Sequence, residues 1–572
     1  MIRRKNMKKM ITTIGVLATV AMSAANAVDI VQKESNETTI NFVHIGDIHG
    51  HLIPRAHVRD DGNGMKQGGL ARMYTLIKEM REKDDQLILL NTGDTIQGSA
   101  EALFTRGEAL VEVLNAFNIN YYAPGNWDWL YGKERFKELF VGKDAYSHWN
   151  PIIANIYNAE DDTHIVEPYR IQTVKGVKVG FLGFTSERGP MIVGPSVISG
   201  LKFSNGDAEF KKYVKELRPQ VDVLVVLSEL GLAKNIALSK EHPGVDFVFS
   251  SDMHEETPKE IILKNGTILV EEGQDGTRVG EMSVTLRDHK IVGHKFTFHI
   301  VDEKIKPDAK MAALVKKVRA PFLDEVRAKK YVNPFSKRYL TGAIDAVIGK
   351  TDVDLHRSNF SDSVMPAVVE GSSHDFLTDV FRTQSGADIG LLRGFRYGTH
   401  IKVGDIHRED IYHYIPIGPF LAKGEITGQT IKNVIENSAN GSLSGNVSEW
   451  TGGWLFAWSG LHYDLTPNAK KGERATNITV LDKKTGKYLP LKLEKVYTVA
   501  GYNYEEEPNH INKVASKFIK FVKNDKGEIL DAIDAVEDYL KVQNANPELN
   551  RIRIIAPLSK PNYTNREIQP LP

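Results

Sequence analysis

The 572-residue sequence contains no cysteine. Disulfide bonds, thiolate metal sites and thiol nucleophiles are therefore excluded, and histidine, aspartate, glutamate and asparagine remain as metal-binding side chains. The chain has 73 basic and 73 acidic residues, which give a formal net charge of zero. This balance gives no electrostatic reason to expect binding to nucleic acid or to an anionic membrane surface.

A hydrophobic run long enough to cross a bilayer is also missing near the N-terminus, where the apolar stretch covers only Ile11–Met22. Basic residues precede it, and the small-x-small sequence Ala25-Asn26-Ala27 follows. We expect residues 1–27 to be a cleavable signal peptide and the mature protein to be periplasmic, without a membrane anchor. Arg3-Arg4 leaves the twin-arginine route open beside the general secretory route.

Short β-rich runs alternate with amphipathic segments from Thr39 to about Val301, which predicts a layered α/β domain over residues 36–301. The charged segment 302–336, apolar at helical spacing, predicts a linking helix. A second, α+β domain is predicted for residues 337–557, followed by a tail at 558–572. The runs expected to be strands are Ile40–Ile45, Gln86–Leu90, Ile119–Tyr122, Val177–Phe184, Val221–Leu227, Val245–Phe249, Thr267–Val270 and Met282–Leu286.

Polar residues follow five of these runs where each run ends. Because ligand-binding residues of α/β folds gather on loops at the carboxyl ends of strands, we interpret the five segments as a two-metal hydrolytic site. Taken singly, each segment is also explained as ordinary turn chemistry of Asp, Asn and Gly. The segments are Asp47-Ile48-His49, Gly93-Asp94, Gly125-Asn126-Trp127-Asp128, Ser228-Glu229-Leu230-Gly231 and Ser251-Asp252-Met253-His254.

Two adjacent divalent ions need a carboxylate between them and oxygen or nitrogen ligands on both sides. Asp47 and His49 are two residues apart on an extended segment, so both can bind one ion. Asp94 follows a strand-like run and suits the bridging position. Asn126 offers a neutral oxygen.

A set of motifs along nearly the whole mature chain carries a resemblance to known families. The first domain resembles the calcineurin-like metallophosphoesterases, and the two-domain layout resembles bacterial periplasmic 5′-nucleotidases. The resemblance implies a four-layer αββα first domain and a C-terminal domain of the 5′-nucleotidase type that binds substrate. The motifs are Asp47-x-His49, Gly68-Gly69-Leu70-Ala71-Arg72, Asn91-Thr92-Gly93-Asp94, Gly125-Asn126, Ala154-Asn155, Gly183-Phe184-Thr185 and Gly273…Gly276.

By this resemblance, Asp47, His49, Asp94 and His254 would bind one ion, and Asp94, Asn126, Glu229 and Asp252 the other. Glu229 and Asp252 stand where the family has histidines. An all-oxygen second site favours Mn²⁺ or Mg²⁺ over Zn²⁺, with Fe a further candidate. The two substitutions add negative charge, which opposes a dianionic substrate unless a metal or another cation offsets it.

The third departure is Trp127, at the position of a family histidine that acts as a general acid or stabilises the transferring group. Indole has one N–H donor and does not titrate. We take Asn126, Trp127 and Asp128 as the candidate catalytic loop, with Trp127 as a packing aromatic the alternative. Residues 125–132, Gly-Asn-Trp-Asp-Trp-Leu-Tyr-Gly, are similar to a sister group, the thiosulfohydrolases of the Sox sulfur-oxidation system.

In the second domain, the resemblance assigns substrate binding to Arg393, Arg396 and Tyr504. Guanidinium groups give bidentate donors to an oxyanion, although ion pairs at the surface or between domains would also explain both arginines. One base-stacking aromatic of the nucleotidases is lost in Pro416-Ile417-Gly418-Pro419, and Tyr504 preserves the other.

The chain is thus predicted to be an exported hydrolase with two divalent ions, most simply a phosphomonoesterase of the 5′-nucleotidase type that uses a metal-bound hydroxide on a small-molecule nucleotide. The alternative is a thiosulfohydrolase-like enzyme that releases sulfate from a sulfur-carrier protein. A third reading is a binding protein that holds metal or anion without turnover.

Overall fold

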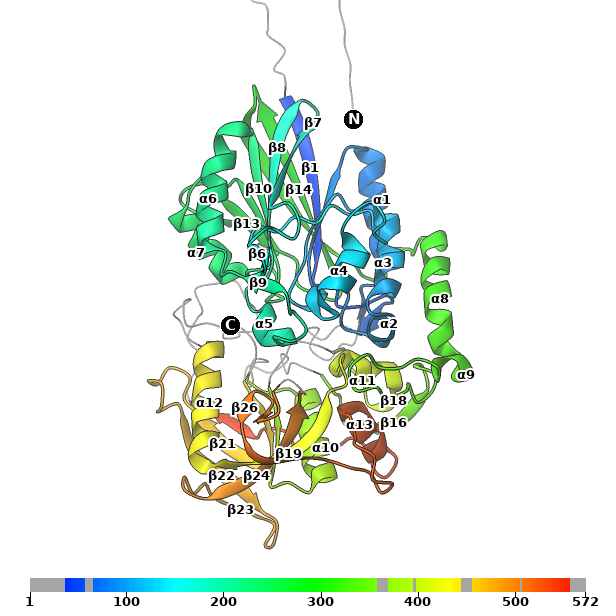
Figure 1. Cartoon of the computed structure of the whole chain (residues 1–572), viewed down its shortest axis with the longest axis vertical. Helices are drawn as coiled ribbons and strands as arrows, with labels where there is room; N and C mark the ends of the chain where they lie inside the picture. Colours follow the sequence, from blue (N-terminus) through cyan, green and yellow to red (C-terminus); the bar gives the residue numbers. More distant parts are fainter. Residues whose placement is uncertain are drawn as a thin grey trace, which may run out of the picture.

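The computed structural model describes residues 37–56, 65–356, 369–393, 398–443, 455–504 and 507–555 (Figure 1). The expected signal peptide at 1–27, the tail at 558–572 and Arg396 lie outside these ranges. Two bodies lie one above the other in Figure 1, with helix α8 (Ala309–Leu323) beside both. The domain boundaries given above remain predictions.

The upper body contains two mixed β-sheets. The first has strand order β15-β14-β1-β4-β5, and the second has the order β12-β13-β11-β10-β8-β7. Parallel pairs join β1, β4 and β5, and likewise β8, β10, β11 and β13. The bounds are β1 (Glu37–Gly46), β4 (Ile88–Thr92), β5 (Tyr121–Ala123), β7 (Tyr169–Val174), β8 (Val177–Phe184), β10 (Val223–Ser228), β11 (Phe247–Ser250), β12 (Ile261–Ile262), β13 (Ile268–Glu271), β14 (Arg278–Arg287) and β15 (Lys290–Ile300).

Side chains on one face of β1 pack between the two sheets. Ile40 and Phe42 belong to a buried cluster shared by both sheets, and the Phe42 ring lies 6.2 Å from that of Phe181 in β8. Val43 and Ile45, on the opposite face of the strand, belong to a different cluster. Both faces of β1 are therefore buried over Phe42–Ile45, where three of the four residues are apolar.

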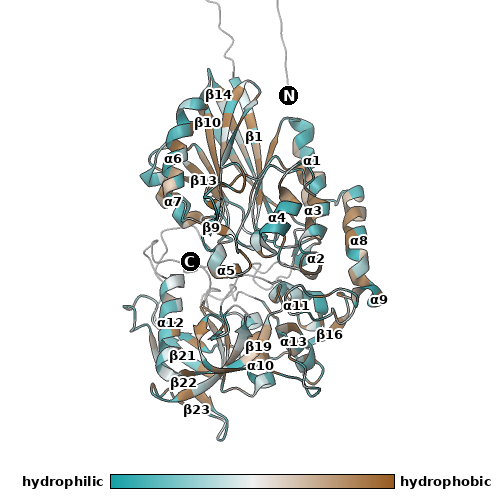
Figure 2. Cartoon of the chain, in the orientation of Figure 1, coloured by the Kyte–Doolittle hydropathy of each residue, from teal (hydrophilic) through white to brown (hydrophobic). Residues whose placement is uncertain are grey.

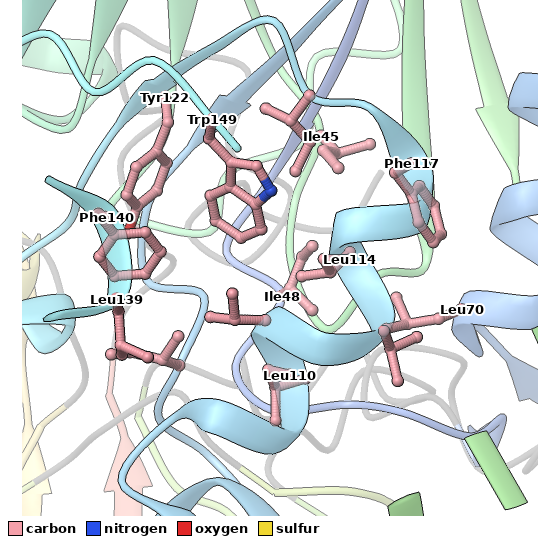
Figure 3. Close-up of a cluster of buried hydrophobic side chains, with 14 of the residues drawn as sticks. Ile45, Ile48, Leu70, Leu110, Leu114, Phe117, Tyr122, Leu139, Phe140 and Trp149 are labelled. Atoms are coloured by element: carbon pink, nitrogen blue, oxygen red, sulfur yellow. The ribbon is translucent and has the colours of Figure 1, made fainter. Parts of the chain in front are cut away.

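Helices cover the outer face of each sheet. The cluster of Val43 and Ile45 also holds side chains from α1 (Leu70–Lys83), α3 (Glu108–Leu114) and α4 (Gly132–Phe140), among them Leu70, Leu110 and Phe140 in Figure 3. The second sheet packs against α6 (Asp207–Leu217) and α7 (Leu232–Glu241). Figure 2 shows brown strands inside and teal on the covering helices. The predicted four-layer αββα arrangement is confirmed.

The amphipathic segment Ala102–Phe117 is not one continuous helix. It divides into α2 (Ala100–Thr105) and α3, separated by Arg106 at φ 52° and Gly107 at φ 87°. A Cβ at Gly107 would lie 2.8 Å from the Cβ of Ile96, so the turn needs glycine. The two helices pack in different places, since Leu103 and Phe104 of α2 belong to a cluster with the second domain and Leu110 of α3 belongs to the cluster of Val43.

The lower body is α+β, as predicted. A five-stranded sheet has the order β20-β17-β24-β19-β27, and a four-stranded sheet has the order β23-β22-β21-β28. The bounds are β17 (Ile389–Leu392), β19 (Phe420–Thr427), β20 (Ala457–Ser459), β21 (Leu461–Leu465), β22 (Ala475–Asp482), β23 (Lys487–Pro490), β24 (Val496–Asn503), β27 (Lys517–Phe521), β28 (Ile552–Ile554), α10 (Ser372–Ser385), α11 (Arg408–Tyr414), α12 (Gly428–Leu443) and α13 (Ala532–Leu540).

Within the described ranges, none of the helices combines the length and the apolar character that a bilayer crossing requires. The helix expected in the linking segment is α8, followed by the short α9 (Glu325–Ala328). Asp308 caps α8, since its carboxylate accepts hydrogen bonds from the backbone N–H groups of Lys310 and Met311.

A buried ion-pair group fastens α8 to both bodies. The Arg319 Nε lies 2.6 Å from Glu101 Oε1 in α2, and Arg319 Nη2 pairs with Glu409 in α11. Glu409 also pairs with Arg55 of the first domain. Arg319 thus connects two buried carboxylates, and it is the only ion-pair partner of Glu101 among the described residues.

We predict that Arg319→Met lowers the free energy of unfolding by about 3–5 kcal/mol, because it leaves the buried Glu101 without its partner. Denaturant unfolding followed by circular dichroism measures the loss. The matched control is Lys317→Met on the same helix, whose exposed pair with Glu112 contributes at most about 1 kcal/mol. Equal losses in both variants would contradict a buried structural role for Arg319.

Candidate metal centre

Strands from both sheets end at one point between the two bodies. Asp47 directly follows β1, Glu229 follows β10, and Asp252 follows β11 by one residue. The Asp252 backbone N–H donates to Asp47 Oδ2 at 3.0 Å, which joins the loop after β11 to the loop after β1. The loops after β4 and β5 add Asp94 and Asn126. The parallel strand arrangement therefore gathers the polar loops that the sequence singled out.

Five of the expected metal ligands have left-handed backbone, which is uncommon for residues other than glycine. Such positions cost about 1–3 kcal/mol each and concentrate at functional sites. Surrounding contacts hold the backbone in this conformation. One example is the hydrogen bond that the Asp47 N–H donates to Gly93 O at 2.9 Å. The φ angles are 45° at Asp47, 46° at His49, 42° at Asp94, 90° at Asp252 and 60° at His254.

The first group of ligand atoms combines Asp47, His49 and His254, all buried and within 4.8 Å of one another. The Nε2 atoms of the two histidines lie 2.8 Å apart, and Asp47 Oδ1 lies 3.5 Å from His49 Nε2. Gln97 Oε1 lies 3.2 Å from His49 Nδ1, which orients that ring. Burial lowers the pKa of His49, but Asp47 and Asp94 more than offset this and raise it to about 9.

The second group combines Asp47, Asp94 and Glu229, again within 4.8 Å. Asp94 Oδ1 accepts a hydrogen bond from the Trp127 backbone N–H at 2.7 Å, and Asn126 Nδ2 donates to Asp94 Oδ2 at 3.4 Å. Asp47 is common to both groups, although the sequence had suggested Asp94 as the bridge. Asp94 lies farther from the first group, with Oδ2 3.9 Å from His49 Nε2.

The chemistry of these residues fits divalent ions. Asp47 Oδ1, Asn126 Oδ1 and Glu229 Oε2 are buried without a hydrogen-bond partner among the described residues. Burial and the neighbouring negative charges raise the pKa values of Asp94 and Glu229 well above their usual range. Bound cations would supply both the missing partners and the missing positive charge. Two imidazoles suit a borderline ion in the first group, and oxygen ligands suit a harder ion in the second.

Asp252 lies beside these groups but is held by protein donors. Its Oδ2 accepts from the guanidinium of Arg188, and its Oδ1 accepts from Asn126 Nδ2 at 3.1 Å. Arg188 was not among the residues singled out in the sequence. It comes four residues after the buried run Val177–Phe184, in the loop before α5 (Gly189–Val193), and this placement is the signal that could have found it.

Asp128 contacts the backbone on both sides of the candidate catalytic loop. Its Oδ1 accepts from the backbone N–H groups of Thr95 and Ile96 at 2.9 and 3.1 Å, and its Oδ2 accepts from Gly125 N–H at 2.9 Å. Asp128 does not line the cleft described next. These contacts suit a positioning role, and the catalytic role that the sequence suggested for Asp128 stays a prediction.

A cavity of about 640 Å³ lies between the two bodies and reaches the ligand groups. Asp94, Asn126 and Trp127 line it from the first domain, where Trp127 also packs against the hydrophobic cluster of Figure 3. Arg188 and His254 also line it, and the second domain contributes Arg393 and Tyr504, among others.

The cavity holds positive charge opposite the carboxylates. Burial and the nearby charge of Arg188 lower the pKa of Arg393, for which the described residues provide no ion pair. Burial raises the pKa of Tyr504 to about 12, so its hydroxyl stays protonated and can donate a hydrogen bond. Arg396, the other expected substrate-binding arginine, lies outside the described residues.

Comparison with protein families identifies both parts of the chain. Residues 40–256 match the calcineurin-like phosphoesterase family, and residues 347–509 match the 5′-nucleotidase C-terminal domain. The chain is 24% identical to the NAD 5′-nucleotidase of Haemophilus influenzae over 89% of its own length and 90% of that protein. It is 23% identical to endonuclease YhcR of Bacillus subtilis over 69% of its length, but it spans only 32% of that longer protein.

Two solved structures share the two-domain fold. The sulfate thiohydrolase SoxB of Thermus thermophilus has a TM-score of 0.76 at 19% identity, over 91% of this chain and 98% of SoxB. A 5′-nucleotidase precursor from Thermus thermophilus has a TM-score of 0.73 at 22% identity, over 90% and 99%. At such identities the likeness establishes the fold alone. The chain thus contains a calcineurin-like phosphoesterase domain followed by a 5′-nucleotidase C-terminal domain, which are the domains of a metal-dependent ester hydrolase.

Proposed function

We propose that this chain is an exported phosphomonoesterase of the 5′-nucleotidase type that works with two divalent ions, Mn²⁺ first among the candidates. The observation that carries the proposal is that two ligand groups sharing Asp47 open into one cavity, which Arg393 also lines. A cavity of about 640 Å³ suits a small-molecule substrate such as a nucleotide. The basic segment and apolar stretch at the N-terminus support a periplasmic location.

Asp47, His49 and His254 would hold one ion, and Asp47, Asp94, Glu229 and Asn126 Oδ1 the other. When bound, the ions would lower the pKa of the attacking water and neutralise charge that develops on the transferring group. The chain's own contribution is orientation. Gln97 fixes the His49 ring, the Trp127 backbone N–H fixes Asp94, and Arg393 offers paired donors to a substrate oxyanion.

Trp127 supports a second candidate, release of sulfate from a sulfur-carrier protein. Hydrolysis of an alkyl phosphate needs a proton for its leaving group, and the indole of Trp127 cannot supply one. A persulfide-type leaving group is a weaker base and needs no such donor. The cavity would then receive a modified side chain of the carrier in place of a free nucleotide.

One experiment separates the candidates. Purified full-length protein loaded with Mn²⁺ is incubated with nucleoside monophosphates and, separately, with thiosulfate-type esters. Phosphate release from the nucleotides supports the first proposal, and sulfate release supports the second. If neither is released although Mn²⁺ binds tightly, the chain is a metal-binding or anion-binding protein without turnover on these classes.

We predict that Asp94→Asn removes about one ion per chain and lowers turnover by more than the roughly 10- to 100-fold typical for loss of a group behind a metal ligand. The substitution removes one of the three negative charges in the group of Asp47, Asp94 and Glu229. Elemental analysis counts the ions. Asp162→Asn is the control, because Asp162 is exposed and does not line the cavity. Full metal occupancy with normal turnover would remove Asp94 from the ligand set.

We also predict that Trp127→His raises turnover of nucleoside monophosphates by about tenfold or more, the low end of general-acid effects, because imidazole titrates near neutrality. Activated aryl phosphates, whose leaving groups need no proton, should gain little. Trp127→Phe controls for loss of the indole without adding an acid. Equal changes on both substrate types would place residue 127 outside the proton path and leave packing as its role.

A further inference from the structure

Asp252 and Glu229 differ in their surroundings, although both replace histidines in the family pattern. Both oxygens of Asp252 accept hydrogen bonds from protein donors, one from Arg188 and one from Asn126. Glu229 Oε1 accepts from Ser251 Oγ at 2.5 Å, whereas its Oε2 is buried with no partner among the described residues. A buried carboxylate oxygen without a hydrogen-bond donor destabilises the folded protein. A bound cation would therefore stabilise Glu229 more than it would stabilise Asp252.

The distances between candidate ligand atoms also separate Glu229 from Asp252. Glu229 lies within 4.8 Å of Asp47 and Asp94, and Asp252 belongs to neither of the two groups found among the described residues. Asp252 is nevertheless fixed in place, since its backbone N–H donates to Asp47 Oδ2 and its side chain is only 2% exposed. It is therefore a neighbour of the second group, held at a set position by contacts of its own.

Arg188 is the cation that balances Asp252. Its Nη2 pairs with Asp252 Oδ2 and lies 3.0 Å from the sulfur of Met253, the next residue. A guanidinium keeps its charge at all relevant pH values, so this balance does not depend on protonation. The Asp252 side chain is buried, whereas that of Arg188 is 23% exposed, so removing Arg188 would leave a buried carboxylate without this counter-charge.

We propose that Arg188 is a positioning residue that keeps Asp252 out of the metal ligand set, so that Asp47, Asp94 and Glu229 bind the second ion. The second ion is then bound without Asp252, which the sequence analysis had included among its ligands. Because ligand charge tunes the affinity for hard ions, this ion binds more weakly and exchanges more readily than it would with Asp252. The inference rests on the proposed function, since it requires the two divalent ions.

Two matched variants test the ligand assignment, Glu229→Gln and Asp252→Asn, which both turn a buried carboxylate into an amide. Titration of the metal-free full chain with Mn²⁺, by calorimetry and elemental analysis, gives the number and affinity of bound ions. We expect Glu229→Gln to lose about one ion, and Asp252→Asn to keep the wild-type count with affinity within about threefold. Loss of an ion from Asp252→Asn, as from Glu229→Gln, would overturn the proposal.

A third variant tests the role of Arg188. Arg188→Gln frees Asp252, so we expect the second Mn²⁺ to bind at least about tenfold more tightly, and the double variant with Asp252→Asn to lose this gain. Lys234→Gln is the control, because Lys234 pairs with the adjacent Glu187 but does not line the cavity. An unchanged second affinity in Arg188→Gln would overturn the proposal.

The same titration separates this inference from the proposed function. If the wild-type chain binds no Mn²⁺ at all, the two-ion function fails and the inference fails with it. If the wild type binds two ions and Asp252→Asn binds one, only the inference fails. Circular dichroism of each variant confirms that it is folded, and the charge-neutral double variant Arg188→Gln/Asp252→Asn gives a readout even if the single arginine variant unfolds.

Discussion

The repulsion among buried carboxylates is the constraint on which this structure depends. Asp47, Asp94 and Glu229 are all buried and bring their oxygens within 4.8 Å of one another. Their raised pKa values express the cost, since burial and mutual charge both disfavour ionisation. Packing of the two sheets supplies the energy that holds them together. The site is thus made receptive to cations by the stability of the scaffold around it.

The scaffold holds the loops after β4 and β5 so close together that a side chain does not fit at two positions. A Cβ at Gly93 would lie 1.9 Å from the Gly125 nitrogen, and a Cβ at Gly125 would lie 2.2 Å from Asp94 Oδ1. The loops after β4 and β5 therefore touch through bare backbone, which brings Asn126 beside Asp94. Asp128 completes the contact by accepting three backbone N–H groups from the two loops. Neighbouring strands, two glycines and one carboxylate together determine where the ligands stand.

Much of this could be predicted from sequence, because each ligand follows an apolar run and parallel strands end at a common edge. The strand Val177–Phe184 and the αββα layering needed only local pattern and resemblance. The partners of Asp252 could not be foreseen, since Arg188 reaches it from a loop 64 residues away in the chain. Nor could the break at Arg106 and Gly107, which depends on contact with Ile96. Local pattern places a residue on an element, but tertiary contact decides what its side chain meets.

The ion pair between Arg188 and Asp252 also affects the net charge of the site, which the sequence predicted to be unfavourable for an anion. Glu229 and Asp252, in place of neutral histidines, bring negative charge to a site for which we propose an anionic substrate. With Asp252 balanced by Arg188, two divalent ions would carry one more positive charge than the three remaining carboxylates carry negative. Arg393 adds a further positive charge from the opposite wall. Attraction of an anion therefore does not require the family's histidines, because an arginine of the first domain restores part of the positive charge that their replacement by carboxylates removes.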